Sequence, residues 1–183
     1  MQILDKNKKD NVLNSMMKII DAQRNTIIDA NKKDLDAFNR DDQALYDRLV
    51  VNDAKVDDMI RAIKEVKEQV DPVNREISND TLDSGLNIVN RTAPFGTIMI
   101  IYESRPDVTI EAAVLAFKAN NKILLKGGKE AYNSNKVLVQ CWHEALAENG
   151  LDNDWITMLE LNREETQEFL KNPGQPLDLI VPR

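Results

Sequence analysis

The sequence predicts an α/β protein whose C-terminal half forms a mostly parallel β-sheet, and two observations support this prediction. Beyond Pro94, short apolar runs rich in β-branched residues alternate with longer segments of helical periodicity, in the order strand, helix, strand, helix, strand, helix, strand. Alternation of this kind produces βαβ units, whose parallel strands are covered on both faces by helices. Before residue 76, apolar residues recur at helical spacing among Lys, Asp and Asn, which predicts amphipathic helices.

The N-terminal part predicts two or three helices that end near residue 70. Asp71-Pro72 stops the helical pattern, because a proline ring removes a hydrogen-bond donor and disfavours helix in the residue before it. Residues 76–92 then alternate between apolar and polar types, with Asp83-Ser84-Gly85 in the middle. This predicts two short strands joined by a turn. Such a ribbon has exposed edges that can pair with another chain.

The alternating part predicts four strands and three helices. We expect the strands at 97–102, 122–126, 155–159 and 177–181, and the helices at 107–119, 131–148 and 163–171. The first of these helices is apolar almost all round, which is typical of a helix buried between a sheet and its neighbours. Ligands of open parallel sheets bind beyond the carboxyl ends of the strands, so the loops that follow the strands are where a site is expected.

Composition excludes several classes of function. With 183 residues the chain can form one domain with a proper core and an appended lobe. Its 31 acidic against 24 basic residues give a net charge of -7, which argues against a nucleic-acid partner but not against a small phosphate-bearing ligand. The N-terminus is too polar for a signal peptide, and the longest apolar run, near 98–102, is too short to cross a bilayer. A cytoplasmic protein that binds no membrane is predicted.

Polar side chains interrupt the apolar pattern directly after the first strand of the predicted sheet. The break reads Tyr102-Glu103-Ser104-Arg105-Pro106, and a helix follows. Proline suits the first turn of a helix, and Asp107 favours the positive end of the helix dipole. Backbone N–H groups in such a loop can bind an anion or stabilise a developing oxyanion. The pattern alone leaves open a capped helix with Glu103 and Arg105 paired in solvent.

A cluster of lysine and glycine follows the second strand. Lys126, Gly127, Gly128 and Lys129 separate that strand from the next helix. Glycine permits a positive φ and close approach of a ligand to the backbone, while lysine supplies a point charge for phosphate. The segment contains neither GxxxxGK[ST] nor GxGxxG, so neither standard nucleotide-binding motif applies. A tight glycine turn with two surface lysines stays the alternative interpretation.

The single cysteine and the single histidine indicate no further chemistry. Cys141 lies in an apolar helical stripe, which is typical of an inert core residue, and one cysteine allows no internal disulfide. His143 is expected on the surface of a helix and not as a general base. No second thiol or imidazole lies near it in the sequence, so no metal site is predicted.

Three segments of the chain resemble the γ-glutamyl phosphate reductases of the aldehyde dehydrogenase superfamily. They read APFGTIMIIYESRPDVT, NNKILLKGGKEAYNSN and the closing LDLIVPR. Softer matches are DANKKDLDA near residue 29, YDRLVV near residue 46 and DPV at 71–73, so the resemblance runs along essentially the whole chain. It implies a Rossmann-like, mostly parallel sheet of the aldehyde dehydrogenase type, with N-terminal helices and a short β-ribbon arm.

The resemblance also implies an organisation and an activity. Residues 1–75 are an N-terminal helical segment, 76–92 a ribbon that serves as an oligomerisation arm, and 93–183 an incomplete dinucleotide-binding domain. The implied enzyme is an NADPH-dependent oxidoreductase of proline biosynthesis, which converts L-glutamyl 5-phosphate to L-glutamate 5-semialdehyde and releases phosphate. A cysteine thiolate forms a thioester with the acyl group, and a hydride from NADPH reduces it. The implied partners are the glutamyl phosphate substrate, further copies of the chain and glutamate 5-kinase.

Roles for single residues follow from the same resemblance. Ser104 matches an asparagine that stabilises the oxyanion in related dehydrogenases. Arg105 and Glu103 are implied in substrate binding, with Arg105 meeting a phosphate or carboxylate, and Tyr102 and Glu103 line the path of the cofactor. Lys126 matches a lysine or arginine of the relatives that reaches the adenosine ribose. Lys129 matches a position that often holds glutamate in NAD-using relatives, and a cation there suits the 2′-phosphate of NADP. The implied cofactor-binding residues are Tyr102, Lys126, Gly127, Gly128, Lys129 and Pro182.

The chain departs from the family in one main respect. The family's nucleophilic cysteine lies in a catalytic domain that this sequence lacks, since the chain stops at Arg183 within a motif that continues into Gly-Gly, and Cys141 does not match that cysteine. Asn74 also stands where the family usually has glycine. One alternative is therefore a truncated, non-catalytic module for nucleotide binding or assembly. Another is a different aldehyde dehydrogenase relative with another acyl donor, which the YESRP segment disfavours.

Overall fold

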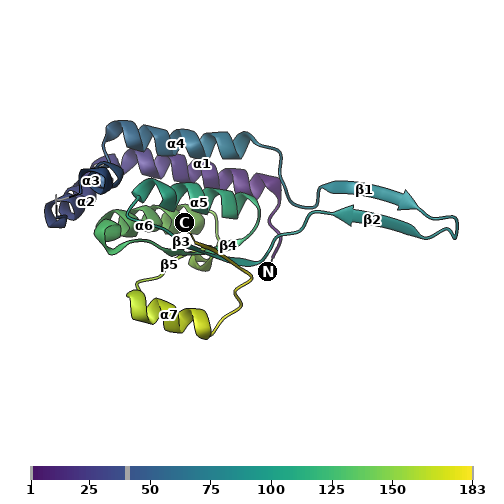
Figure 1. Ribbon diagram of the computed structural model, residues 1–183. Coiled ribbons are helices and arrows are strands. Elements are labelled where there is room, and N and C mark those ends of the chain that lie inside the picture. Colours follow the sequence, from purple (N-terminus) through teal and green to yellow (C-terminus); the bar gives the residue numbers. More distant parts are fainter. Residues whose placement is uncertain (1, 40–41, 183) are drawn as a thin grey trace.

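The computed structural model describes residues 2–39 and 42–182, and its first part consists of helices (Figure 1). They are α1 (Lys6–Ala22), α2 (Arg24–Ala37), α3 (Gln43–Leu49) and α4 (Asp53–Glu68). The prediction of two or three helices was therefore too low. The apolar stripe continues across the break between α1 and α2, where only Gln23 leaves the helical pattern, so periodicity alone cannot separate them. Side-chain caps from Asp5, Asp42 and Asn52 fix the starts of α1, α3 and α4.

The predicted ribbon is present as an antiparallel hairpin of β1 (Glu76–Thr81) and β2 (Asn87–Arg91). It projects away from the rest of the molecule (Figure 1), and all of its strand residues are exposed. Gly85 in the connecting turn has φ 83°. Asn74, which precedes the hairpin, has φ 57°, a left-handed conformation that glycine adopts without cost and asparagine tolerates. The departure from glycine at this position therefore keeps the backbone geometry.

The predicted parallel sheet has the strands β3 (Thr97–Ile101), β4 (Lys122–Lys126), β5 (Ile156–Met158) and β6 (Leu179–Pro182). Their order is β5-β4-β3-β6, and every neighbouring pair is parallel. The connecting helices are α5 (Pro106–Lys118), α6 (Tyr132–Glu148) and α7 (Arg163–Lys171), with short 3-10 turns η1 (Lys129–Ala131) and η2 (Asn153–Trp155). The α/β fold and the alternation of its elements are thus as predicted, with boundaries that differ by a few residues.

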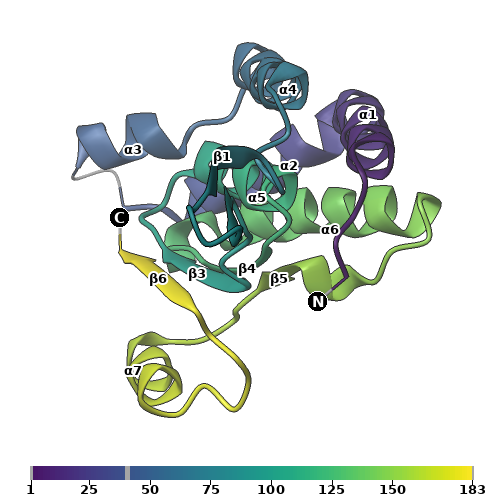
Figure 2. The ribbon, with the colours of Figure 1, turned by 90° about the vertical axis from the view of Figure 1, so that its right-hand side faces the viewer.

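The elements form layers around one core. Helices α5 and α6 lie on one side of the sheet and α7 on the other (Figure 2). Helices α1, α2 and α4 pack against α5 and α6 from outside, so buried side chains form a continuous cluster from Leu4 to Ile156. At its centre the Phe117 ring lies 5.8 Å from Trp142 and 5.5 Å from Trp155 between centroids. Large aromatic surfaces in such contacts contribute strongly to the core.

Strand register brings the predicted loops together at one edge of the sheet. Ile101 pairs with Lys126 and with Pro182, so β3, β4 and β6 end side by side. The loops after β3 and β4 therefore meet at the carboxyl edge, where parallel sheets bind their ligands. Within the described ranges, every helix is too short or too polar to traverse a bilayer.

Candidate functional site

Tyr102 begins the loop after β3 and is almost completely buried. Its backbone N–H donates to the Lys126 carbonyl at 3.0 Å, which extends the pairing of the two strands by one residue. Its hydroxyl lies 2.7 Å from Thr109 Oγ1, and Thr109 in turn donates to Asn135 Oδ1 at 2.8 Å. Burial raises the pKa of Tyr102 to about 12. The buried Tyr102 side chain thus anchors the loop after β3, and it does so as a neutral phenol.

Ser104, the candidate oxyanion residue, contacts the loop after β4. Its side chain is 8% exposed, and Oγ donates to Glu130 Oε2 at 2.6 Å. The hydroxyl proton is therefore directed at a carboxylate in this arrangement. An oxyanion at Ser104 has to compete with Glu130 for that proton, or use the backbone N–H of the loop instead. Glu130 was not among the predicted site residues, because a carboxylate at the start of a helix carries no local signal of such a contact.

Glu103 and Arg105 do not pair with each other, so the alternative of a solvent pair between them is wrong. Glu103 binds Arg48 of α3 at 3.1 Å, and Arg105 binds Asp107 of its own helix at 3.0 Å. The hydrogen bond with Asp107 raises the pKa of Arg105. Lys55 of α4 also lies 3.8 Å from Asp107. Opposite charges thus attach the loop to the N-terminal helices. Ion pairs between residues about 50 positions apart have no local signal in the sequence.

A cavity of 420 Å³ lies at the base of the hairpin, and a larger cavity of 690 Å³ lies at the carboxyl edge of the sheet. The larger one has two walls. The β-strand wall carries Tyr102 and the segment from Lys126 to Lys129, and the α7 wall carries Asn162, Arg163 and Thr166. Of the residues predicted to hold the cofactor, Tyr102, Lys126, Gly127, Gly128 and Lys129 thus share one cavity. Pro182 ends β6 at the same edge but does not line it. Arg183 lies outside the described residues.

Close packing, not positive φ, explains the two glycines of this cavity. Gly128 has φ -65°, and neither glycine has a positive φ, which corrects the first of the two expected reasons. A Cβ atom on Gly127 would lie 2.5 Å from Asn135 Nδ2, and one on Gly128 would lie 2.4 Å from Ser104 Oγ. Any side chain here would push the two loops apart. The glycines therefore let the backbone after β4 lie directly against the loop after β3.

The α7 wall was missed by the sequence-based prediction. Its start has a capping box: Asn162 accepts from Glu165 N–H at 2.9 Å, and Glu165 accepts from Asn162 N–H at 2.7 Å. The pattern Asn-x-x-Glu before a helix is a known start signal, but it does not tell which side chains face a cavity. Asn135 was missed as well. It is buried, and within the described part of the chain its Nδ2 has no hydrogen-bond partner.

Cys141 and His143 lie away from this edge. Cys141 is fully buried on α6, where burial raises the pKa of its thiol to about 12 and keeps it protonated. His143, expected on the helix surface, is half-buried, and its Nε2 lies 2.8 Å from the Ile156 carbonyl of β5. Among residues 2–39 and 42–182, no group of three or more His, Cys, Asp or Glu side chains is arranged to hold a metal ion.

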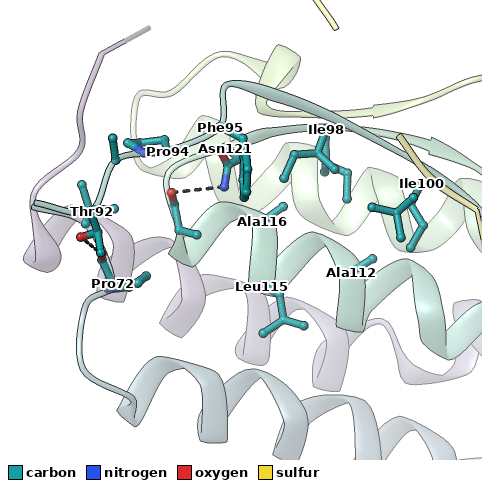
Figure 3. Close-up of a pocket in the computed structure, with 15 residues that line it drawn as sticks. Pro72, Thr92, Pro94, Phe95, Ile98, Ile100, Ala112, Leu115, Ala116 and Asn121 are labelled. Atoms are coloured by element: carbon teal, nitrogen blue, oxygen red, sulfur yellow. Dashed lines mark hydrogen bonds between the residues drawn. The ribbon is translucent and has the colours of Figure 1, made fainter. Parts of the chain in front are cut away.

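The smaller cavity is almost entirely apolar (Figure 3). It lies between α5, the start of β3 and the base of the hairpin, and is lined by residues such as Phe95, Ile98 and Leu115. Phe95, before β3, is 67% exposed. Leu115 of α5 is 54% exposed, so this helix is not buried all round as expected. No charged side chain lines this cavity in the described part of the chain. It therefore offers contact area and no groups for catalysis.

The fold defined by this sheet, these helices and this hairpin is that of aldehyde dehydrogenase-type proteins. A solved probable aldehyde dehydrogenase of Listeria monocytogenes matches 97% of the chain with a TM-score of 0.71, at 12% identity and over 36% of its own length. A solved gamma-glutamyl phosphate reductase of Thermotoga maritima matches 98% of the chain with a TM-score of 0.92, at 34% identity and over 44% of its length.

Curated relatives carry the same name. The gamma-glutamyl phosphate reductase of Aquifex aeolicus is 39% identical over 178 residues, which are 96% of this chain and 41% of the relative. No protein-family model matches the chain. The homologues of the chain are therefore gamma-glutamyl phosphate reductases, and the chain spans about two fifths of the length of those it matches.

Proposed function

We propose that the chain provides the cofactor-binding part of a reductase that converts L-glutamyl 5-phosphate to L-glutamate 5-semialdehyde and phosphate. The observation that supports this most is the similarity along 96% of the chain to a reductase of that name. The cavity at the carboxyl edge of the sheet agrees with it, because a nicotinamide nucleotide needs an open crevice of this kind. The proposed cofactor is NADPH, which supplies a hydride when bound.

The cavity fits a phosphate-bearing dinucleotide. Lys126, Lys129 and Arg163 line it, and in the described part of the chain no Asp or Glu does. Phosphate groups are stabilised by such uncompensated cations. Gly127 and Gly128 line the same cavity, although the space that a Cβ atom would need is filled by protein atoms and not open to a ligand. The expected roles of Lys126 at the adenosine ribose and of Lys129 at the 2′-phosphate are part of this proposal.

Ser104 and Arg105 are proposed for the acyl end of the reaction. Ser104 lies where the loops after β3 and β4 touch, and its proton, now directed at Glu130, is the one available to an oxyanion. Arg105 and Glu103 are proposed to contact the substrate. The thiolate that accepts the acyl group is expected outside this chain, because Cys141 is buried and protonated. A cytoplasmic location, self-association through the β1–β2 hairpin and association with glutamate 5-kinase complete the proposal.

A titration of the chain with NADPH tests the cofactor part. We expect NADPH to quench the fluorescence of Trp142 and Trp155 or to give a calorimetric signal that saturates. Lys126→Gln should weaken this binding, while Lys64→Gln, at an exposed position on α4, should leave it unchanged. No binding at millimolar NADPH would contradict the proposal for this chain.

A chimera tests the catalytic part. The chain replaces the matching 178 residues of the Aquifex aeolicus reductase, and the reverse reaction is followed as NADPH formation from glutamate 5-semialdehyde, phosphate and NADP. Activity that Ser104→Ala reduces, with NADPH affinity unchanged, is the expected result. A chimera that folds and binds NADPH but forms none would favour the second candidate, a non-catalytic binding or assembly module. The observation behind that candidate is that the chain spans only 41% of this relative.

A further inference from the structure

Two cations face the larger cavity from opposite walls. Lys129 begins η1 on the β-strand wall, and Arg163 begins α7 on the other wall. We propose that Arg163 is a specificity-determining residue that binds the 2′-phosphate of the NADPH adenosine, together with Lys129. The inference rests on the proposed function, since it assumes that this cavity takes a nicotinamide nucleotide. It assigns to α7 a role that neither the motifs of the sequence nor the strand-end loops indicated.

Arg163 is not engaged by a carboxylate of the described residues. Most arginines of the described residues bind a carboxylate within 4.0 Å, as Arg24, Arg48, Arg61, Arg91 and Arg105 do. In that same part of the chain no carboxylate lies within this distance of the Arg163 guanidinium or the Lys129 ammonium. In a protein with a net charge of -7, two cations without such a partner on one cavity favour an anionic ligand there.

Three other residues at the start of α7 already use polar groups in hydrogen bonds with one another. Asn162 and Glu165 exchange hydrogen bonds in the capping box, and Thr166 Oγ1 donates to the Asn162 carbonyl at 2.6 Å. These contacts engage the Asn162 and Glu165 N–H groups and the Thr166 hydroxyl, and they hold the first turn in place. Of the α7-wall residues that line the cavity, Arg163 carries the positive charge.

A guanidinium presents parallel N–H donors that bind two phosphate oxygens at once, whereas lysine acts as a point charge. Lys129 and Arg163 together can neutralise a phosphate monoester, which carries nearly two negative charges at neutral pH. A ribose without the 2′-phosphate offers the second cation only neutral hydroxyl groups and no negative charge. NADPH and NADH should thus differ in how much they depend on Arg163.

The test compares nucleotides with and without the 2′-phosphate on the intact chain. The probes are NADPH against NADH, and 2′,5′-ADP against 5′-AMP, titrated calorimetrically into the native chain, Arg163→Gln, Arg163→Lys and Lys129→Gln. Arg163→Gln should weaken NADPH and 2′,5′-ADP about tenfold and change NADH and 5′-AMP less than about twofold. Arg163→Lys should recover part of the loss. Arg75→Gln, at an exposed arginine beside the hairpin, is the matched control and should change nothing.

The outcomes separate the inference from the proposed function. If NADPH binds and Arg163→Gln weakens all four nucleotides equally, or none, the inference is overturned while the cofactor site stands. If the native chain binds 2′,5′-ADP more tightly than 5′-AMP and loses this preference in Arg163→Gln, the inference holds, even where the nicotinamide half adds no affinity. If the native chain binds none of the four, the cofactor site and the inference both fall.

Discussion

Contacts between single residues hold the two loops of the site together. Lys126, Gly127, Gly128 and Lys129 could be predicted as a strand-end cluster, and all four line the cavity. Their contacts could not, because Gly128 meets Ser104 only through the register of β3 against β4. The hydrogen bond from Ser104 to Glu130 joins residues 26 positions apart for the same reason. Chemistry at one loop can be anticipated from the sequence, but contacts between loops depend on how the strands align.

Tyr102 gives a prediction at this scale. Its pKa is about 12 in the folded protein against 10.0 ordinarily, so above pH 10 the unfolded chain ionises while the folded protein keeps the proton. The unfolded chain then binds fewer protons, and the free energy of unfolding falls as pH rises. Near neutral pH, Tyr102→Phe should cost about 1 kcal/mol through its lost hydrogen bond with Thr109. By about pH 11.5 the native protein should have lost about 2 kcal/mol relative to the variant.

Urea unfolding of the native protein and of Tyr102→Phe between pH 8 and about pH 11.5 measures this difference in unfolding free energy. The two free energies should approach each other and then cross as the pH rises. Curves that stay parallel across this range would show that the phenol of Tyr102 ionises alike in the folded and unfolded chain. The buried position of the side chain under the site would then have no electrostatic consequence.

At the scale of elements, some helix starts are capped by a neighbouring residue in the sequence, and others are capped by a residue far away in the chain. Asp5, Asp42 and Asn52 cap their own helices, so their type and spacing are visible in the sequence. Helix α6 has no such cap. Its first turn donates to Asp34 of α2, whose carboxylate accepts from the backbone and side chains of Asn133 and Ser134 at 2.6 to 3.0 Å. A cap supplied from about 100 residues away has no local signal, although α6 itself was predicted from its periodicity.

Removing this distant cap should destabilise the whole molecule. Asp34→Ala leaves four donors at the start of α6 without their acceptor in a buried place, so we expect a loss of about 2 to 3 kcal/mol of unfolding free energy. Asp34→Asn keeps one acceptor oxygen, so its free energy of unfolding should lie between those of the native protein and Asp34→Ala. Asp36→Ala, on the exposed face of the same helix, is the matched control and should stay within about 0.5 kcal/mol. Chemical denaturation measures all three, and equal stability of Asp34→Ala and the control would refute the cap.

At the scale of the whole molecule, the body has a buried core and the β1–β2 hairpin is exposed. The body has one continuous core, to which helices α1, α2 and α4 and the sheet region all contribute, so a boundary near residue 75 stays a prediction. The hairpin was predicted from alternation and a turn, and all of its strand residues are exposed in the part of the chain that the structure describes. Ile88 pairs with Asp80 and Val89 with Asn79, so neighbouring apolar residues point to opposite faces of the ribbon. A two-stranded ribbon exposed on both faces is marginally stable alone, so we expect it to pair with a second surface.

Deleting the hairpin should therefore change assembly and leave the body folded. The ends of the hairpin are close, since Asn74 N–H donates to the Thr92 carbonyl at 3.1 Å, so two glycines can replace residues 75–91. Sedimentation should give more than one chain per particle for the native protein and a single chain for the deletion, at nearly equal melting temperatures. Ile88→Lys keeps the ribbon, because the new cation faces Asp80 across the strands, and should weaken self-association without a deletion. A native chain that sediments as a monomer at about 100 μM, or a deletion that still self-associates, would mean that copies of this chain do not pair through the hairpin. The exposed apolar residues of the ribbon would then require a partner of another kind.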